Sequence, residues 1–250
     1  MAPAAGRAPA VPGLVLVCDH ARNSVPPELS LGLPAEEMDR HIAYDVGARG
    51  VTLAMAEALG APAVLSRFSR LVIDPNRGAD DPTLVMKIYD GTVIPGNRGA
   101  DAAEVARRLH AYYWPYHTAV EAAVATVGRA PVLVSIHSFT PQLKARAPRP
   151  WHVGVLYNHD RRLVDPLLAA LAEARLDEVG AGSGPLVVGD NEPYSGQLDG
   201  DCMDRHATRP GHPHALIEVR NDLIADAAGQ RAWGGLLARA VARAAAAMAD

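Results

Sequence analysis

Four short apolar runs, each of which ends in polar residues, constrain the fold of this 250-residue chain more than any other feature of its sequence. They span residues 14–18, 132–136, 152–156 and 215–219. Apolar runs of this length are typical of strands that are buried on both faces of a sheet. Helical patterns alternate with them along the chain, which is typical of a sheet covered by helices. We therefore predict an α/β fold, a single three-layer domain in which a mixed, mostly parallel sheet has helices on both faces.

Weaker patterns complete the predicted order of elements. Short strands are predicted at 63–65, 71–73 and 186–188, and a mostly irregular stretch at 82–99. Helices are predicted at about 47–59, 102–127, 161–176 and 226–248. The Ala- and Pro-rich residues 1–12 are predicted to be a flexible lead-in, so that residues 13–250 form the domain.

Composition excludes several classes of function. Lys and Arg number 24 against 28 Asp and Glu, and a net charge of −4 gives no basic surface for nucleic acid or anionic membranes. The chain has no run of roughly 18 apolar residues, and its first residues lack the apolar core of a signal peptide. Cys18 and Cys202 are too few for a disulfide framework and are expected to be buried thiols in a reducing compartment. We expect a cytoplasmic protein that acts on a small molecule; the sequence does not indicate its oligomeric state.

Two histidines stand at the ends of predicted strands. His20 and His137 each follow an apolar run, and the carboxyl ends of parallel strands meet at one edge of a sheet. Neutral imidazole is the commonest metal ligand in proteins, and a catalytic zinc needs about three protein ligands. The alternative is that each is an ordinary loop histidine, since the sequence contains no HExxH motif.

A carboxylate lies inside the last predicted strand. Glu218 belongs to the segment ALIEVRND, and burial raises the pKa of a carboxyl group toward values that suit a general base. The alternative is an ion pair between Glu218 and Arg220 or Arg77.

Three further residues could take part in a site or serve the fold. Asn76 and Arg77 follow a predicted strand in the segment DPNR, where they could bind a carboxylate or form a turn with a surface arginine. Asp45 has apolar neighbours at a helix junction, where it could bind a metal or cap the helix that follows.

A polar, glycine-rich loop at 189–196 carries Tyr194. A loop of this kind could close over a substrate or simply connect two elements. The next stretch holds His206, His212 and His214, whose spacing matches no standard metal motif; they are candidates for the loop itself or for contacts behind a site.

Taken together, these segments resemble the N-formylglutamate amidohydrolase family. Eight segments match in the family's order, between residues 14 and 224: CDHARNSVP, HIAYDVGARG, SRLVIDPNR, IPGN, YHTAV, SIHSFTP, GDNEPYSG and PHALIEVRNDLI. The resemblance implies a fold similar to zinc-dependent exopeptidases of the carboxypeptidase type.

The resemblance also implies a metal and a general base. By it, His20 and His137 bind Zn²⁺ or another divalent ion, and Glu218 is the general base. The related peptidases take a further ligand from a His-x-x-Glu pattern, whereas this chain has Asn23 at that position. A neutral amide is a poor zinc ligand, so Asp45 is the first substitute as third ligand, with Asp19 or water as alternatives.

The remaining roles concern the substrate. The resemblance assigns the substrate carboxylate to Asn76 and Arg77, and a catalytic role to Tyr194. Asn97 and Ser138, in two of the matching segments, are assigned to substrate binding. The implied reaction is hydrolysis of an N-acyl amino acid, with N-formylglutamate cleaved to glutamate and formate. A hydrolase of the same fold that acts on another N-acyl compound or a peptide, and a non-catalytic binding homologue, are the alternatives.

Overall fold

The computed structural model describes residues 8–128 and 130–248. Of the predicted lead-in, residues 1–7 lie outside the described residues, and residues 8–12 contain no helix or strand. Within the described part, no helix is long and apolar enough to cross a membrane.

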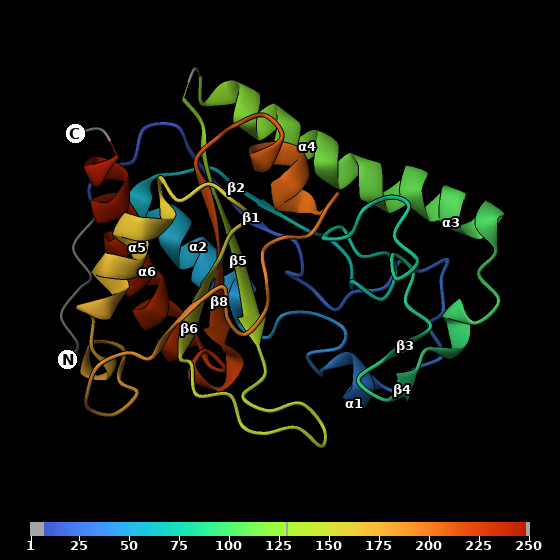
Figure 1. Cartoon of the computed structure of the whole chain (residues 1–250). Helices are drawn as coiled ribbons and strands as arrows, with labels where there is room; N and C mark the ends of the chain where they lie inside the picture. Colours follow the sequence, from blue (N-terminus) through green and yellow to red (C-terminus); the bar gives the residue numbers. More distant parts are fainter. Residues whose placement is uncertain (1–7, 129, 249–250) are drawn as a thin grey trace.

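A six-stranded sheet forms the centre of the molecule (Figure 1). Its strands, in spatial order, are β2 (Ala63–Leu65), β1 (Leu14–Cys18), β5 (Val132–Phe139), β8 (His214–Arg220), β6 (Val153–Leu156) and β7 (Val188–Asp190). Only the β6–β8 pair is antiparallel, and the other four pairs are parallel. The predicted mixed, mostly parallel sheet is therefore confirmed, and all four apolar runs are strands.

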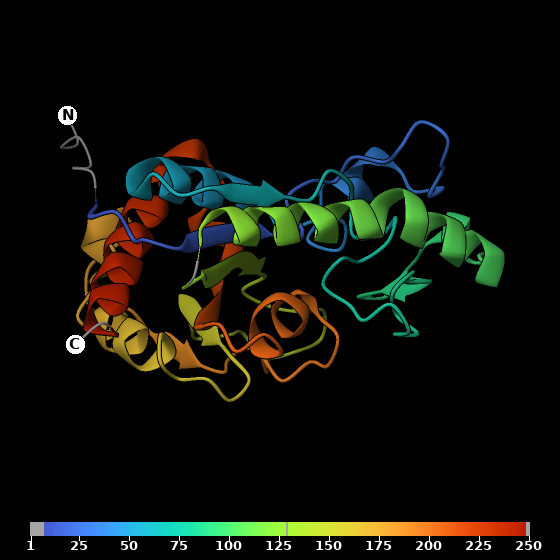
Figure 2. The ribbon, with the colours of Figure 1, turned by 90° about the horizontal axis from the view of Figure 1, so that it is seen from above.

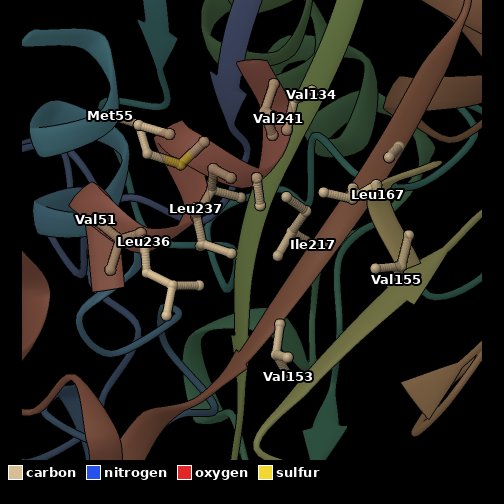
Figure 3. Packing of buried hydrophobic residues seen from close by; sticks show 14 of the residues in the cluster. Val51, Met55, Val134, Val153, Val155, Leu167, Ile217, Leu236, Leu237 and Val241 are labelled. Carbon is tan, nitrogen blue, oxygen red and sulfur yellow. The ribbon is translucent and has the colours of Figure 1, made fainter. Parts of the chain in front are cut away.

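One face of the sheet packs against three helices, α2 (Ala48–Leu59), α5 (Val164–Ala172) and α6 (Ala227–Ala247). Val134 of β5 and Ile217 of β8 meet Met55 of α2 and Leu237 of α6 in this layer (Figure 3). All four side chains are fully buried, and burial of one such side chain contributes about 1.5–3 kcal/mol.

The other face packs against α4 (Trp114–Thr126) and the short π-helical segment η4 (Asp204–Thr208). Alternate strand residues reach this side, so that Val17 and Leu216 contact Tyr116 and Val120 of α4. The predicted helix at 102–127 is α3 (Ala102–Arg108), a π-helical turn η2 (Leu109–Tyr113) and α4 in one continuous run (Figure 2). Helices on both faces confirm the predicted three-layer arrangement.

The smaller elements lie around this framework. The helix α1 (Ala35–Met38) and the hairpin of β3 (Ile88–Tyr89) and β4 (Thr92–Val93) stand apart from the sheet (Figure 1). Short 3-10 turns occupy η1 (Pro95–Asn97), η3 (Leu176–Val179) and η5 (Asn221–Leu223).

The predicted strand at 71–73 is wrong. These residues form a turn, and two of their carbonyls bond to side chains in place of a neighbouring strand. Asn97 Nδ2 donates to the Leu71 carbonyl, and Arg108 Nη1 donates to the Val72 carbonyl, each at 2.8 Å. The backbone carbonyls of this apolar run therefore accept hydrogen bonds from buried polar side chains instead of from a neighbouring strand. The spacing of apolar residues in the sequence gives no sign of such bonds.

Candidate active site

Three neighbouring parallel strands bring the candidate residues to one edge of the sheet. His20 follows β1, His137 lies near the end of β5, and Glu218 on β8 is the register partner of His137. They line one cavity of about 330 Å³. The same cavity is lined by the other candidates Asp45, Asn76, Arg77, Ser138 and Tyr194.

Two imidazoles and one carboxylate converge at the buried end of this cavity. Asp45 Oδ2 lies 2.8 Å from His137 Nδ1 and 3.3 Å from His20 Nδ1. All three side chains are buried, and their potential ligand atoms lie within 4.8 Å of one another. Two histidines and a carboxylate are a usual donor set for a catalytic divalent metal. This cluster, which we call the His20–Asp45–His137 cluster, therefore fits a metal ion.

The other ring nitrogen of each imidazole, Nε2, lies close to a second carboxylate. His20 Nε2 lies 2.6 Å from Asp74 Oδ1, and His137 Nε2 lies 2.9 Å from Asp19 Oδ2. When Nε2–H donates to these carboxylates, the lone pair of each Nδ1 faces Asp45. Burial alone would raise the pKa of the Asp19 carboxyl, but the hydrogen bond and charge of His137 bring that pKa below its usual value.

The buried charges around the cluster are unequal. Asp19, Asp45 and Asp74 are fully or almost fully buried, and Arg70 is the guanidinium bonded to two of them, at 2.8 Å from Asp74 Oδ2 and 3.4 Å from Asp45 Oδ1. With neutral imidazoles, these four residues carry two negative charges in excess. Buried charge of this kind must be compensated, and a divalent cation would compensate it.

Asp45, the first candidate for the third ligand, lies beside both imidazoles. The backbone N–H of Ser138 donates to Asp45 Oδ2 at 3.2 Å, which orients the carboxylate. The side chain of Asp45 does not cap α2, whose N-cap residue is Gly47 without a side-chain hydrogen bond. Asn23 points elsewhere, since its Nδ2 donates to the Met38 carbonyl and to Asp39 Oδ1.

Glu218 is buried, and its carboxyl group belongs to the same cavity. Its Oε2 has no hydrogen-bond partner among residues 8–128 and 130–248. Burial raises the pKa of Glu218 to about 7. Arg220 is engaged elsewhere, because its Nε donates to Asp222 Oδ1 at 2.8 Å. The arrangement suits a group that accepts and returns a proton near neutral pH.

Asn76 and Arg77 also line the cavity. Asn76 N–H donates to Asp74 Oδ1 at 2.9 Å, so the turn considered in the sequence is present. Arg77 Nε has no hydrogen-bond partner in the described part of the chain, and its nearest carboxylate oxygen, on Asp74, is 4.0 Å away. The Tyr113 hydroxyl donates to the Arg77 carbonyl at 2.7 Å and fixes the backbone there. Arg77 lines the cavity, so its side chain lies beside the space that an anion could enter.

Tyr194 lines the cavity from the 189–196 loop. Its ring lies under the Arg149 guanidinium, 4.8 Å from the ring centre, and 40% of the residue is exposed. Burial of the hydroxyl, with the nearby charge of Glu218, raises the pKa of Tyr194 to about 12. The phenol is therefore a hydrogen-bond donor at neutral pH.

The other two predicted substrate-binding residues, Asn97 and Ser138, make hydrogen bonds within the protein. Asn97 does not line the cavity: it is fully buried, its Nδ2 donates to the Leu71 and Met86 carbonyls, and its Oδ1 accepts from Arg108. Its amide has no free group for a substrate. Ser138 lines the cavity, but its hydroxyl donates to the Val46 carbonyl at 2.8 Å.

Sequence reasoning missed Asp74 and considered Asp19 only as an alternative third ligand. Asp74 lies in the segment DPNR and Asp19 directly precedes His20, so both were within matched segments. Asp201 also lines the cavity; it is 3% exposed, and burial raises its pKa to about 7. A lone acid in a polar loop carries no sequence pattern that would have identified it.

Comparisons with known proteins identify a matching family and similar folds. A sequence model of a family described as N-formylglutamate amidohydrolase matches residues 13–225. The crystal structure of a gene product from Agrobacterium tumefaciens is similar at 36% identity and a TM-score of 0.85, covering 96% of this chain and 93% of that chain. An N-formylglutamate amidohydrolase from Ralstonia eutropha JMP134 shares the fold at 24% identity and a TM-score of 0.66, covering 98% of this chain and 96% of that one. A search of curated proteins gave no match.

Proposed function

This chain belongs to the N-formylglutamate amidohydrolase family, and from that premise we propose that it is a metal-dependent hydrolase of N-acyl amino acids. N-Formylglutamate, cleaved to glutamate and formate, is the substrate proposed first. The observation that carries the proposal is the meeting of five side chains in one cavity: the three of the His20–Asp45–His137 cluster, together with Glu218 and Arg77.

His20, Asp45 and His137 would hold the metal, which we propose to be Zn²⁺. Their donor set supports a divalent cation, and so do the two excess negative charges of Asp45 and the residues bonded around the cluster. Such an ion would act as a Lewis acid toward the amide carbonyl. Asp19 and Asp74 would keep both imidazoles in the tautomer that presents Nδ1.

Glu218 would move the proton. Its unpartnered Oε2 would take a proton from the attacking water and return it to the nitrogen of the leaving amine. A pKa of about 7 suits both directions of this transfer, because the carboxylate and the acid are then both populated at neutral pH.

Arg77 and Asn76 would position the substrate. A guanidinium binds a carboxylate through two parallel N–H groups, and Arg77 lacks a competing partner on its Nε. Asn76 Oδ1 accepts from the Cys202 backbone at 3.3 Å, which leaves its amide N–H groups for the same carboxylate. Tyr194 would donate its hydroxyl hydrogen to the bound substrate from the other side of the cavity.

The test combines metal analysis with a substrate panel. Purified protein is analysed for bound metal and assayed for amine release from N-formylglutamate, other N-formyl and N-acetyl amino acids, and dipeptides. Zinc-dependent hydrolysis of N-formylglutamate supports the full proposal. If the protein hydrolyses only other members of the panel, the proposed hydrolase activity stands and the proposed substrate is wrong. Zinc-loaded protein that is inert toward the whole panel would refute the proposal.

A further inference from the structure

A second cluster of potential metal ligands lies between α4 and η4, outside the cavity. It consists of His117 from α4, Cys202, and His206 from η4. All three are buried, with exposed fractions of 1%, 0% and 5%. Their potential ligand atoms lie within 4.8 Å of one another, the same limit that the His20–Asp45–His137 cluster meets. The proposed hydrolysis uses none of them.

The two imidazoles face each other closely. His117 Nδ1 lies 2.8 Å from His206 Nε2, and the ring centres are 5.0 Å apart. A hydrogen bond can occupy this contact, but it leaves His117 Nε2 buried and without a hydrogen-bond partner in the described residues. Burial lowers the pKa of His117 to about 3 and that of His206 to about 4, so both rings are neutral at physiological pH. Neutral imidazole is the form that binds metals.

Charges of both signs lie near the cluster, because the Asp19 carboxylate and the Arg205 guanidinium both act on the His117 and His206 rings. The Asp19 carboxylate reaches this layer from the other side, where its Oδ1 accepts from the Tyr116 hydroxyl at 2.7 Å. Tyr116 and Cys202 belong to the same buried cluster on this face of the sheet. A thiolate and two neutral imidazoles carry one negative charge, which would compensate part of the charge of a divalent ion.

We propose that His117, Cys202 and His206 form a second metal site, separate from the cavity, that binds a borderline-soft divalent ion such as Zn²⁺. Sulfur and nitrogen donors together select zinc over calcium or magnesium. Because the site is closed to the cavity, its role is structural: it would join η4 to α4. The backbone N–H of Cys202 also donates to Asn76 Oδ1, and Asn76 lines the cavity. A metal bound to the Cys202 side chain would therefore also help to hold Asn76 in place.

Cobalt spectroscopy of the whole protein tests the second site directly. Metal-free protein is titrated with Co²⁺, and a thiolate ligand produces an intense charge-transfer absorption in the near ultraviolet. The first cluster contains no sulfur, so this absorption reports the second site alone and does not depend on hydrolytic activity. We expect the absorption, and a stoichiometry of about two ions per chain, in the unmodified protein.

Matched variants identify the ligand. Cys202→Ser should remove the absorption and reduce the stoichiometry to about one, whereas Cys18→Ala, at the other buried cysteine, should leave both unchanged. His20→Ala should lower the stoichiometry and keep the absorption. Unmodified protein that binds one ion and shows no thiolate absorption would overturn the proposal, and so would an absorption that persists in Cys202→Ser. Failure of the hydrolysis assay with the absorption present would refute only the function proposed for the cavity.

Discussion

His137 Nε2 lies 2.9 Å from Asp19 Oδ2, on the side of the imidazole that faces away from Asp45. Because a ring nitrogen that donates to a carboxylate cannot also bind a metal, this contact determines which nitrogen of His137 faces the cluster. His20 is held in the same way by Asp74, at 2.6 Å. Asp19 and Asp74 are thus positioning residues for the proposed metal site.

Replacement of Asp19 should weaken metal binding. In Asp19→Asn the amide no longer provides a negative charge behind His137, and loss of such a partner lowers metal affinity roughly 10- to 100-fold. Competition with a chromogenic chelator measures the change. Ser135→Ala is the matched control, because the Ser135 hydroxyl also donates to Asp19 Oδ2, at 3.0 Å, but its loss keeps the charge. Equal losses in the two variants would contradict a role for the charge of Asp19.

Replacement of Glu218 should remove catalysis and keep binding. Glu218→Gln has nearly the same size but cannot accept the proton, so kcat should fall by roughly 10²- to 10⁴-fold. In the unmodified protein, kcat should rise with pH through an apparent pKa of about 7, as Glu218 loses its proton. The residual kcat of the variant should not show this rise with pH. Isothermal titration with substrate should show that the variant binds substrate about as tightly as the unmodified protein does. If the rise of kcat with pH persists in Glu218→Gln, the titrating group is a different one, such as Asp201.

The convergence of His20, His137 and Glu218 could be predicted because it depends on the strands alone. His20 and His137 follow apolar runs, and Glu218 lies near the end of another. Because β1, β5 and β8 are neighbours in the sheet, these residues meet. The prediction needed only strand positions and the rule that parallel strands end at one edge. The same reasoning could not show which carboxylate completes the cluster.

Asp74, Arg70 and Asn97 show why the rest could not be predicted. They lie in or beside the irregular region 66–101, where no periodicity places a side chain. Asn97 is a structural residue because its amide bonds to backbone carbonyls at 71 and 86, contacts that exist only after the chain has folded. Arg70 and Asp74 are partners at a spacing of four residues without a regular helix. A buried polar network of this kind is determined by tertiary structure.

The raised pKa of Glu218 should make the metal-free protein less stable as pH increases. The folded state holds this proton up to about pH 7, whereas the unfolded chain releases it near its ordinary pKa of 4.5. Between these values the folded state binds more protons, so the free energy of unfolding falls as pH rises and then levels off. The loss is at most roughly 3 kcal/mol, from about 1.4 kcal/mol for each pKa unit.

Glu218→Gln isolates this effect from other titrating groups. The variant cannot ionise, so in the presence of a chelator it should be more stable than the unmodified protein at about pH 8 and similar to it at about pH 4. Urea unfolding at several pH values measures the difference between the two proteins. A stability difference that does not change with pH would show that the Glu218 proton is held no more tightly in the folded state than in the unfolded one.

Replacement of Arg77 should impair substrates that carry a free carboxylate. Arg77→Met keeps much of the aliphatic stem and removes the guanidinium, whose Nε has no hydrogen-bond partner within residues 8–128 and 130–248. A charge-assisted pair of this type contributes about 1.5–3 kcal/mol, so kcat/KM for N-formylglutamate should fall roughly 10- to 150-fold.

An analogue of the substrate serves as the control. When the α-carboxylate is replaced by a primary amide, kcat/KM should differ little between the unmodified protein and the Arg77→Met variant. Arg98→Met, at an exposed arginine outside the cavity, should leave kcat/KM unchanged. If the variant loses activity equally toward the acid and the amide, Arg77 supports the fold of the cavity and does not recognise the carboxylate.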